Sequence, residues 1–132
     1  MRKILSVLLL LVTVTAFAAD HYTLTGGTYS KAMGKEETRD GLILNVTGNK
    51  DRSDVYLEGY EMLGYKDISI KAYLITSPDG TIVDFGDVTI KGVAGARIKT
   101  VKGFLTKSAA DITLDGKVAG VFGFHIRYRA GK

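Results

Sequence analysis

The strongest constraint on the fold of this chain comes from its C-terminal end. Ile112 and Leu114 alternate with polar residues, which is the period of two expected of a half-buried strand. The dipeptide Asp115-Gly116 follows and predicts a tight hairpin turn, because both residues tolerate positive φ angles. The chain then returns over residues 118–128 as a long alternating run. A strand this long must pair on both edges, so it predicts the closing strand of a β-barrel or a central strand of a β-sandwich.

The two faces of this last strand differ in character. One face carries aromatic residues that we expect in the core: Phe122, Phe124 and Tyr128. The other face carries three potential cations: His125, Arg127 and Arg129. If that face lies at a barrel mouth, the cations could hold a carboxylate or phosphate group. If it points outward, they are ordinary solubilising charge.

Similar alternating runs recur about every ten residues along the chain. They predict strands over residues 20–29, 41–47, 54–62, 67–76, 81–91 and 96–105, with the C-terminal hairpin supplying the last two. Bulges are expected at Gly26-Gly27 and at Gly86. The segment 77–80 (SPDG) is a strong turn signal, because proline presets φ and glycine accepts the left-handed position. The pattern leaves residues 30–40 undecided.

These expectations define the fold class. The chain is predicted to be all-β: an antiparallel up-and-down barrel of eight strands, with a β-sandwich as the alternative. Closure into a barrel removes the exposed edges that an open sheet would present. An outer-membrane barrel fits less well, since Glu58, Lys71 and Lys99 interrupt the faces of their strands. We therefore expect no membrane-spanning segment in the mature chain.

Residues 1–19 are predicted to be a signal peptide. Arg2 and Lys3 precede an apolar run over residues 4–14, and Ala16 and Ala18 supply the small residues that a signal peptidase reads. The run is shorter than the about 20 residues that a membrane-spanning helix needs. We therefore expect residues 20–132 to form a single exported domain, periplasmic or secreted.

Charge is unevenly distributed along the predicted domain. Without Arg2 and Lys3 the chain keeps 16 basic and 14 acidic residues, a net charge of about +2. Residues 20–90 hold seven basic and twelve acidic residues, whereas residues 91–132 hold nine and two. The simple interpretation is that acidic early strands pair with basic late ones; the other is a basic face for an anionic partner. The small net charge and the predicted export argue against nucleic acid as a partner.

Sequence signatures of catalysis are missing. The chain has no cysteine, which excludes disulfides, thiolate metal sites and a cysteine nucleophile. Its two histidines, His21 and His125, lie on the predicted first and last strands, which are neighbours in a barrel, but a metal site would need a third ligand. Paired carboxylates such as Glu58 and Glu61 are explained as solvated strand faces. We expect no enzymatic activity, no cofactor and no metal.

Tyrosines provide the remaining candidate site. Tyr56, Tyr60 and Tyr73 lie on strand faces that they share with charged residues, as at a mixed binding surface or a barrel mouth. Together with His125, Arg127 and Arg129 they are the candidate ligand-binding residues. A core role is the competing interpretation for each tyrosine.

The layout of the chain is similar to a known family. The signal peptide, residues 67–91 with their Ser-Pro-Asp-Gly turn, and the aromatic closing run of residues 110–129 resemble the calycin-like, lipocalin-related small secreted β-barrel proteins of Gram-negative bacteria. The Gly-x-Trp signature of true lipocalins is missing, because the chain contains no tryptophan. The resemblance implies a periplasmic or secreted domain that binds a small apolar ligand.

Two functions of different classes follow. The first is binding of a small apolar or amphiphilic ligand in the barrel or at its mouth. The alternative is a protein-interaction or inhibitor module that uses an exposed face. An eight-stranded barrel can be just filled by its own side chains, so a packed interior would favour the second function.

Overall fold

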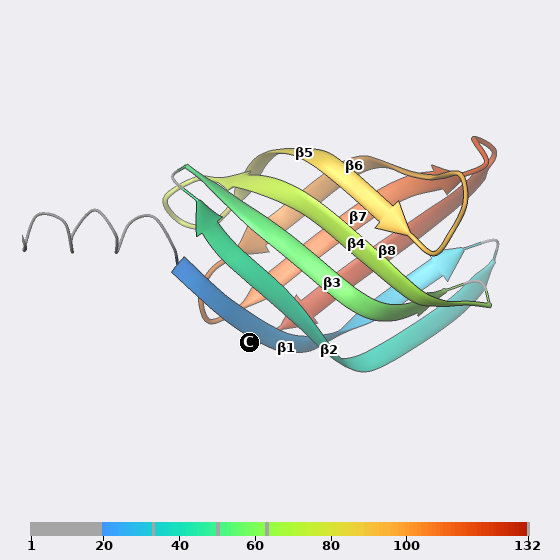
Figure 1. Ribbon diagram of the computed structural model, residues 1–132, viewed down its shortest axis with the longest axis horizontal. Coiled ribbons are helices and arrows are strands. Elements are labelled where there is room, and N and C mark those ends of the chain that lie inside the picture. Colours follow the sequence, from blue (N-terminus) through green and yellow to red (C-terminus); the bar gives the residue numbers. More distant parts are fainter. Residues whose placement is uncertain (1–19, 33, 50, 63, 132) are drawn as a thin grey trace, which may run out of the picture.

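Alternation of apolar and polar residues produces eight antiparallel strands in the computed structural model, which describes residues 20–32, 34–49, 51–62 and 64–131. The strands are β1 (Asp20–Ala32), β2 (Lys35–Asn49), β3 (Arg52–Met62), β4 (Tyr65–Thr76), β5 (Ile82–Lys91), β6 (Ala96–Leu105), β7 (Ala110–Val118) and β8 (Phe122–Ala130). Their order in the sheet is β5-β4-β3-β2-β1-β8-β7-β6. The sheet curls into a nearly closed up-and-down barrel, as predicted (Figure 1). The predicted signal peptide lies outside the described residues.

Closure depends on β1, which pairs with both β2 and β8. The β1–β8 ladder runs from Gly26 opposite Ala130 to Ala32 opposite Phe124. The predicted bulge at Gly26-Gly27 is confirmed by a shift in the β1–β2 register between these two residues. A Cβ atom on Gly26 would lie 2.0 Å from the carbonyl oxygen of Arg129, so only glycine allows β8 to approach this closely.

A gap in the pairing lies between β5 and β6. These strands are neighbours in sequence but form no ladder with each other. β6 instead contacts the turn before β5, through an isolated bridge of Phe104 with Thr81 and a 2.8 Å hydrogen bond from the Leu105 amide to the Gly80 carbonyl. Bulges interrupt both strands, near Gly86 on β5 and at Lys99 on β6. Bulges and lysines are the usual means by which proteins protect a strand edge from pairing with other chains.

Turns show one correct prediction and one error. In the segment 77–80 the Gly80 amide donates to the Ser77 carbonyl at 2.8 Å, which confirms that turn. The predicted turn at Asp115-Gly116 is wrong, because β7 continues to Val118. The chain reverses instead at residues 119–120, both with positive φ, as a type I′ turn requires. Gly116 serves a different purpose: a Cβ there would lie 2.0 Å from the Arg97 carbonyl oxygen.

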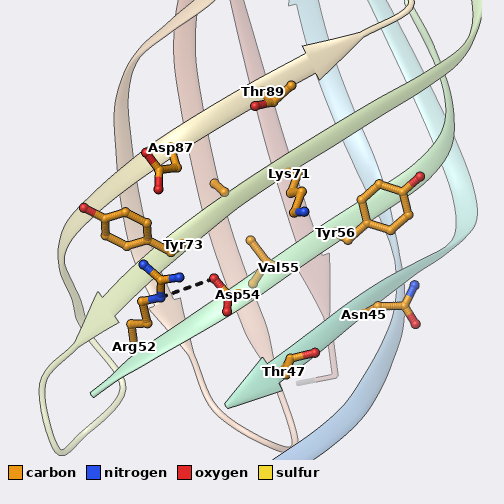
Figure 2. Close-up of a pocket in the computed structure, with 11 residues that line it drawn as sticks. Asn45, Thr47, Arg52, Asp54, Val55, Tyr56, Lys71, Tyr73, Asp87 and Thr89 are labelled. Atoms are coloured by element: carbon orange, nitrogen blue, oxygen red, sulfur yellow. Dashed lines mark ion pairs between the residues drawn. The ribbon is translucent and has the colours of Figure 1, made fainter. Parts of the chain in front are cut away.

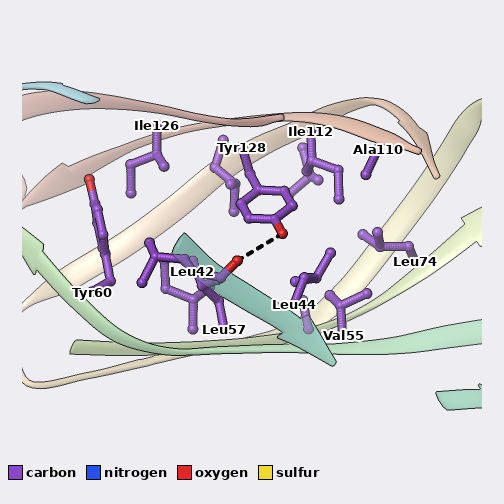
Figure 3. Close-up of a cluster of buried hydrophobic side chains, with 14 of the residues drawn as sticks. Leu42, Leu44, Val55, Leu57, Tyr60, Leu74, Ala110, Ile112, Ile126 and Tyr128 are labelled. Carbon is purple, nitrogen blue, oxygen red and sulfur yellow. Dashed lines mark hydrogen bonds between the residues drawn. The ribbon is translucent and has the colours of Figure 1, made fainter. Parts of the chain in front are cut away.

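The core consists of apolar side chains that the strands direct into the barrel, and Figure 3 shows part of this cluster. Its largest members include Leu44, Leu57, Tyr60, Ile68, Leu74, Ile112, Phe124, Ile126 and Tyr128. Phe124 and Tyr128 are buried as predicted, but Phe122, beside the turn, is 46% exposed. No helix among the described residues is long and apolar enough to cross a membrane.

Candidate binding groove on the outer face

One apolar cavity lies in the barrel interior, among the described core residues. It has a volume of about 30 Å³ and lies between Leu44, Leu57, Leu74, Val101 and Tyr128 and neighbouring apolar side chains. A bound water molecule takes up about 30 Å³, whereas ligand pockets usually measure about 300 to 1,000 Å³. The Tyr128 hydroxyl links β8 to β1 and β2 inside the barrel, because it donates to the Leu24 carbonyl at 2.9 Å and lies 3.2 Å from the Leu42 carbonyl. This cavity is the size of a water molecule.

The outside of the sheet presents a larger hollow. It crosses β2, β3, β4 and β5, with a volume of about 490 Å³ (Figure 2). Two rows of residues cross this face, with one residue from each strand. The first row runs Thr47, Asp54, Tyr73 and Gly86, and the second runs Asn45, Tyr56, Lys71 and Thr89. We call this hollow, together with Arg52 and Asp87 at its rim, the outer groove.

Tyr73 is held in place at one end of the outer groove. The guanidinium carbon of Arg52 lies 4.8 Å from the centroid of the Tyr73 ring, a cation–π contact. Arg52 Nε also lies 3.5 Å from Asp54 Oδ1 (Figure 2). The ring covers Gly86, where a Cβ atom would come within 2.3 Å of the tyrosine hydroxyl. The predicted bulge at Gly86 is confirmed, and it lets β5 pass under the ring.

Tyr56 and Lys71 extend the outer groove along the strands. They are opposite each other in the β3–β4 ladder. The same two residues line an adjoining hollow of about 490 Å³ with Ser69, Thr89 and Lys91. The two hollows therefore form one continuous surface, which mixes aromatic rings with charges of both signs.

The structure divides the predicted site residues into three groups. Tyr56 and Tyr73 lie together in the outer groove. Tyr60 was predicted on the same outward face, which is wrong: a bulge at Gly59 reverses the alternation, and Tyr60 is buried with 1% exposure. The cations of β8 form the third group and lie on another part of the outer surface. Arg52, Asp54 and Lys71 belong to the groove but were not predicted as site residues, because only the register reveals their proximity.

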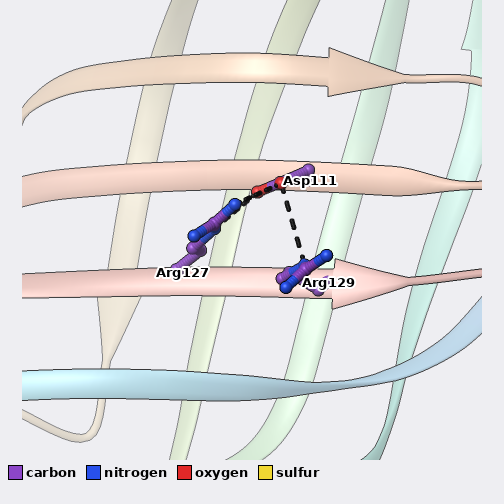
Figure 4. A network of polar contacts seen from close by, with 3 residues as sticks. All are labelled: Asp111, Arg127 and Arg129. Atoms are coloured by element: carbon purple, nitrogen blue, oxygen red, sulfur yellow. Dashed lines mark hydrogen bonds and ion pairs between the residues drawn. The ribbon is translucent and has the colours of Figure 1, made fainter. Parts of the chain in front are cut away.

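His125, Arg127 and Arg129 point outward and engage carboxylates of β7. Arg127 contacts Asp111 through two bonds, of 2.9 Å from Nε and 2.6 Å from Nη2, and Arg129 Nε lies 3.8 Å from the same carboxylate (Figure 4). His125 Nδ1 lies 2.7 Å from Asp115 Oδ1. The hydrogen bond from Arg127 lowers the pKa of the Asp111 carboxyl below its ordinary value. These side chains therefore already have anionic partners.

The paired arginine predicts a pH-dependent contribution to stability. Because the pKa of Asp111 is lowered in the folded chain, its stabilising effect is complete above the ordinary aspartate value of about 3.9 and is lost as the pH falls below it. We expect Asp111→Asn to lower the free energy of unfolding by about 1 kcal/mol at pH 7. Urea unfolding at pH 7 and pH 2.5 checks this, and an equal loss at both values would contradict it.

Charge is segregated around the barrel. Since the strand order keeps β2 to β5 together and β6 to β8 together, acidic early strands and basic late strands lie on different sides. The pairs Arg39–Glu61 and Arg52–Asp54 lie within the first group, and those of Asp111 and Asp115 within the second. Each of these pairs joins residues of the same half, so they differ from the expected pairing of early strands with late ones.

The histidines do not come together. His21 lies opposite Thr47 and His125 opposite Lys31, so the two are ten residues apart along β1. Within the described ranges no group of three histidine, aspartate or glutamate side chains is placed to hold a metal ion.

Comparison with known proteins gives a structural likeness but no family. No family model matches the chain, and no curated protein does. Among solved structures the chain is similar to the ywiB protein from Bacillus subtilis, with 14% sequence identity and a TM-score of 0.43 over 89% of this chain and 99% of that one. Function has to be inferred from the residues of the outer groove themselves.

Proposed function

We propose that this chain is an exported, non-enzymatic β-barrel of calycin-like layout that binds a protein partner through the outer groove. The observation that carries the proposal is the juxtaposition of Tyr56, Tyr73 and Arg52 on an accessible sheet face. Tyrosine and arginine are the residues that most often dominate protein–protein binding energy. Tyr73 is already fixed by Arg52 and Gly86, so little side-chain entropy would be lost on binding.

The shape of the outer groove supports a large partner. Its floor is the outer face of a sheet, and its tyrosines remain half-exposed. A small molecule is usually enclosed over about 70 to 90% of its surface, which such an open hollow does not provide. An extended segment or a convex surface of another protein can contact both rows at once. The charges of both signs in its lining, Arg52, Asp54, Lys71 and Asp87, would match opposite charges on the partner.

Export is the second part of the proposal. Arg2, Lys3, the apolar run of residues 4–14 and the Ala16-Phe17-Ala18 site support a cleaved signal peptide and a periplasmic or secreted location. A chain without cysteine needs no oxidation to mature there. Nucleic acid is not part of the proposal.

Binding of a small apolar or amphiphilic ligand is the other candidate function. The observation in its favour is the purely apolar lining of the interior cavity. At about 30 Å³ this cavity would have to expand about tenfold to reach the lower end of usual ligand pockets. Native mass spectrometry of the processed protein, followed by organic extraction, tests this function: a stoichiometric lipid would favour it, and a clean apo mass would favour the protein partner.

The protein-partner proposal predicts the effect of one substitution. We expect Tyr56→Ala to weaken partner binding by about thirtyfold, the effect of losing a hot-spot residue worth about 2 kcal/mol. Tyr29→Ala is the matched control, since Tyr29 is 39% exposed on β1, outside the groove. The partner is first captured from periplasmic extract, and its affinity for both variants is then measured by calorimetry. Equal affinity of the two variants would contradict the proposal.

A further inference from the structure

One end of the barrel carries an exposed apolar edge. It lies on residues 92–95 (GVAG), between β5 and β6, and residues 118–122 (VAGVF), around the β7–β8 turn, and we call it the lip. Val93 is buried in the core, so the exposed apolar side chains of the lip are those of Ala94, Ala119, Val121 and Phe122. The two segments are joined by a 3.0 Å hydrogen bond from the Ala119 amide to the Gly95 carbonyl. Val121 is 72% exposed and Phe122 46% exposed. Both segments lie at the right of Figure 1, where the β7–β8 turn projects beyond the strands.

Cations lie directly behind the lip. Arg97 is opposite Lys117 in the β6–β7 ladder, and Lys99 occupies the bulge that follows. Lys99 and Lys117 are close enough that their mutual repulsion lowers the pKa of Lys99. The register of β6 and β7 therefore gathers three cations, Arg97, Lys99 and Lys117, next to the lip.

Carboxylates that could neutralise these cations are already engaged. On β6, β7 and β8 the acidic residues are Asp111 and Asp115, which pair with Arg127 and His125. Among the described residues, Arg97, Lys99 and Lys117 form no ion pair with a carboxylate. Asp67, on β4, is the acidic residue whose backbone lies beside Gly92 of the lip. The local excess of positive charge is therefore unbalanced.

We propose that the lip docks on an anionic lipid surface. Val121 and Phe122 enter the boundary between headgroups and acyl chains, while Arg97, Lys99 and Lys117 contact lipid phosphates. Peripheral membrane binding combines these two contributions, buried apolar area and attraction to anionic lipids. A nucleic acid or an acidic protein would pair with the cations but would offer no apolar layer to Val121 and Phe122. A lipid bilayer offers both, because its acyl chains lie directly beneath its anionic headgroups.

This inference goes beyond the proposed function and is compatible with it. The cations of the lip lie on β6 and β7, whereas the outer groove lies on β2 to β5. A barrel docked by its lip keeps the outer groove free for a protein partner. The membrane would then hold the barrel where the partner is met.

Vesicle binding tests the inference. The chain from Asp20 onward is used, so that the apolar run of residues 4–14 contributes nothing, and it is cosedimented with vesicles of phosphatidylglycerol mixed with phosphatidylcholine, or of phosphatidylcholine alone. We expect binding to the anionic vesicles that weakens as salt is raised. Val121→Ser should reduce the partition coefficient by about tenfold and Lys99→Gln by about fivefold.

Matched control variants distinguish binding through the lip from nonspecific adsorption of the protein to vesicles. Val83→Ser removes another exposed valine, 63% exposed on β5 at the other end of the barrel, and Lys107→Gln removes one charge from the β6–β7 loop. Each control should change partitioning by less than about twofold. Equal losses in lip and control variants would overturn the inference, as would equal binding to neutral vesicles or no binding. Retention of the partner by lip variants that no longer bind vesicles would show that the two sites are independent.

Discussion

Replacement of Gly26 by alanine is expected to lower the free energy of unfolding by about 3 kcal/mol or more. The new Cβ atom would lie 2.0 Å from the Arg129 carbonyl oxygen and 2.8 Å from the Ala130 Cβ atom. No rotamer relieves a contact between Cβ and backbone, so the β1–β8 ladder itself has to shift. Urea unfolding followed by circular dichroism measures the loss.

Gly123→Ala is the control for this substitution. A Cβ atom on Gly123 meets nothing within 4 Å, although the residue lies on β8, the strand that pairs with β1. We expect its stability to remain within about 0.5 kcal/mol of the original chain. If Gly26→Ala cost no more than Gly123→Ala, the close approach of β1 and β8 would be disproved.

Tyr128→Ala is expected to cost about 3 to 5 kcal/mol, because it removes a ring buried with 2% exposure at the centre of the core. Tyr128→Phe isolates the hydroxyl, which donates to the Leu24 carbonyl at 2.9 Å. We expect this variant to lose about 1 to 2 kcal/mol. Thermal and urea unfolding of both variants measure the two contributions separately.

Tyr60→Phe should behave in the opposite way. Tyr60 is as buried as Tyr128, and burial raises the pKa of its hydroxyl. The hydroxyls of Thr28 and Ser30 lie near it, but within the described residues neither is placed to form a hydrogen bond with it. Removing a buried, unpaired hydroxyl relieves its desolvation cost, so stability should be unchanged or higher. Equal losses in Tyr60→Phe and Tyr128→Phe would contradict this account.

Local patterns in the sequence predicted most of the architecture. Period-two alternation identified all eight strands, and β6 matches its predicted range, residues 96–105. The bulges at Gly26-Gly27 and Gly86 and the turn at residues 77–80 also follow from local chemistry. β2 is longer than predicted and begins at Lys35. Its first residues are polar, so they carry no apolar period; the ladder with β1 places them in the strand.

The two errors, in the turn at residues 115–116 and in the face of Tyr60, both arise at glycines, because a glycine can serve several structural purposes. Asp115-Gly116 has the composition of a turn, but Gly116 is required by the closeness of β6, which no local pattern records. Gly59 in turn adopts a φ of 79° and inverts the alternation, which moves Tyr60 from the outer face to the core. The sequence alone does not show whether a glycine is needed for a turn, for a bulge or for the close approach of a neighbouring strand.

The candidate site was predictable only in part. Tyr56 and Tyr73 were identified from the strand faces that they share with charged residues. Their proximity to each other and to Arg52 depends on the β3–β4 register, in which Asp54 is opposite Tyr73. Register is set by bulges and turn lengths acting together, so a groove that crosses four strands becomes visible only in the folded chain.

The closing of the barrel by β1 and β8 has a consequence for how the chain folds. Most ladders join neighbours in sequence, but the β1–β8 ladder joins the ends of the domain: the Tyr128 hydroxyl reaches a carbonyl 104 positions away. By contrast, β5 and β6 are consecutive in sequence and are joined by the short segment 92–95, yet they are left largely unpaired. The chain must therefore lose the most conformational entropy when β1 pairs with β8, and the core is incomplete until this happens. We expect folding in milliseconds to seconds, with the pairing of β1 and β8 as the slow step.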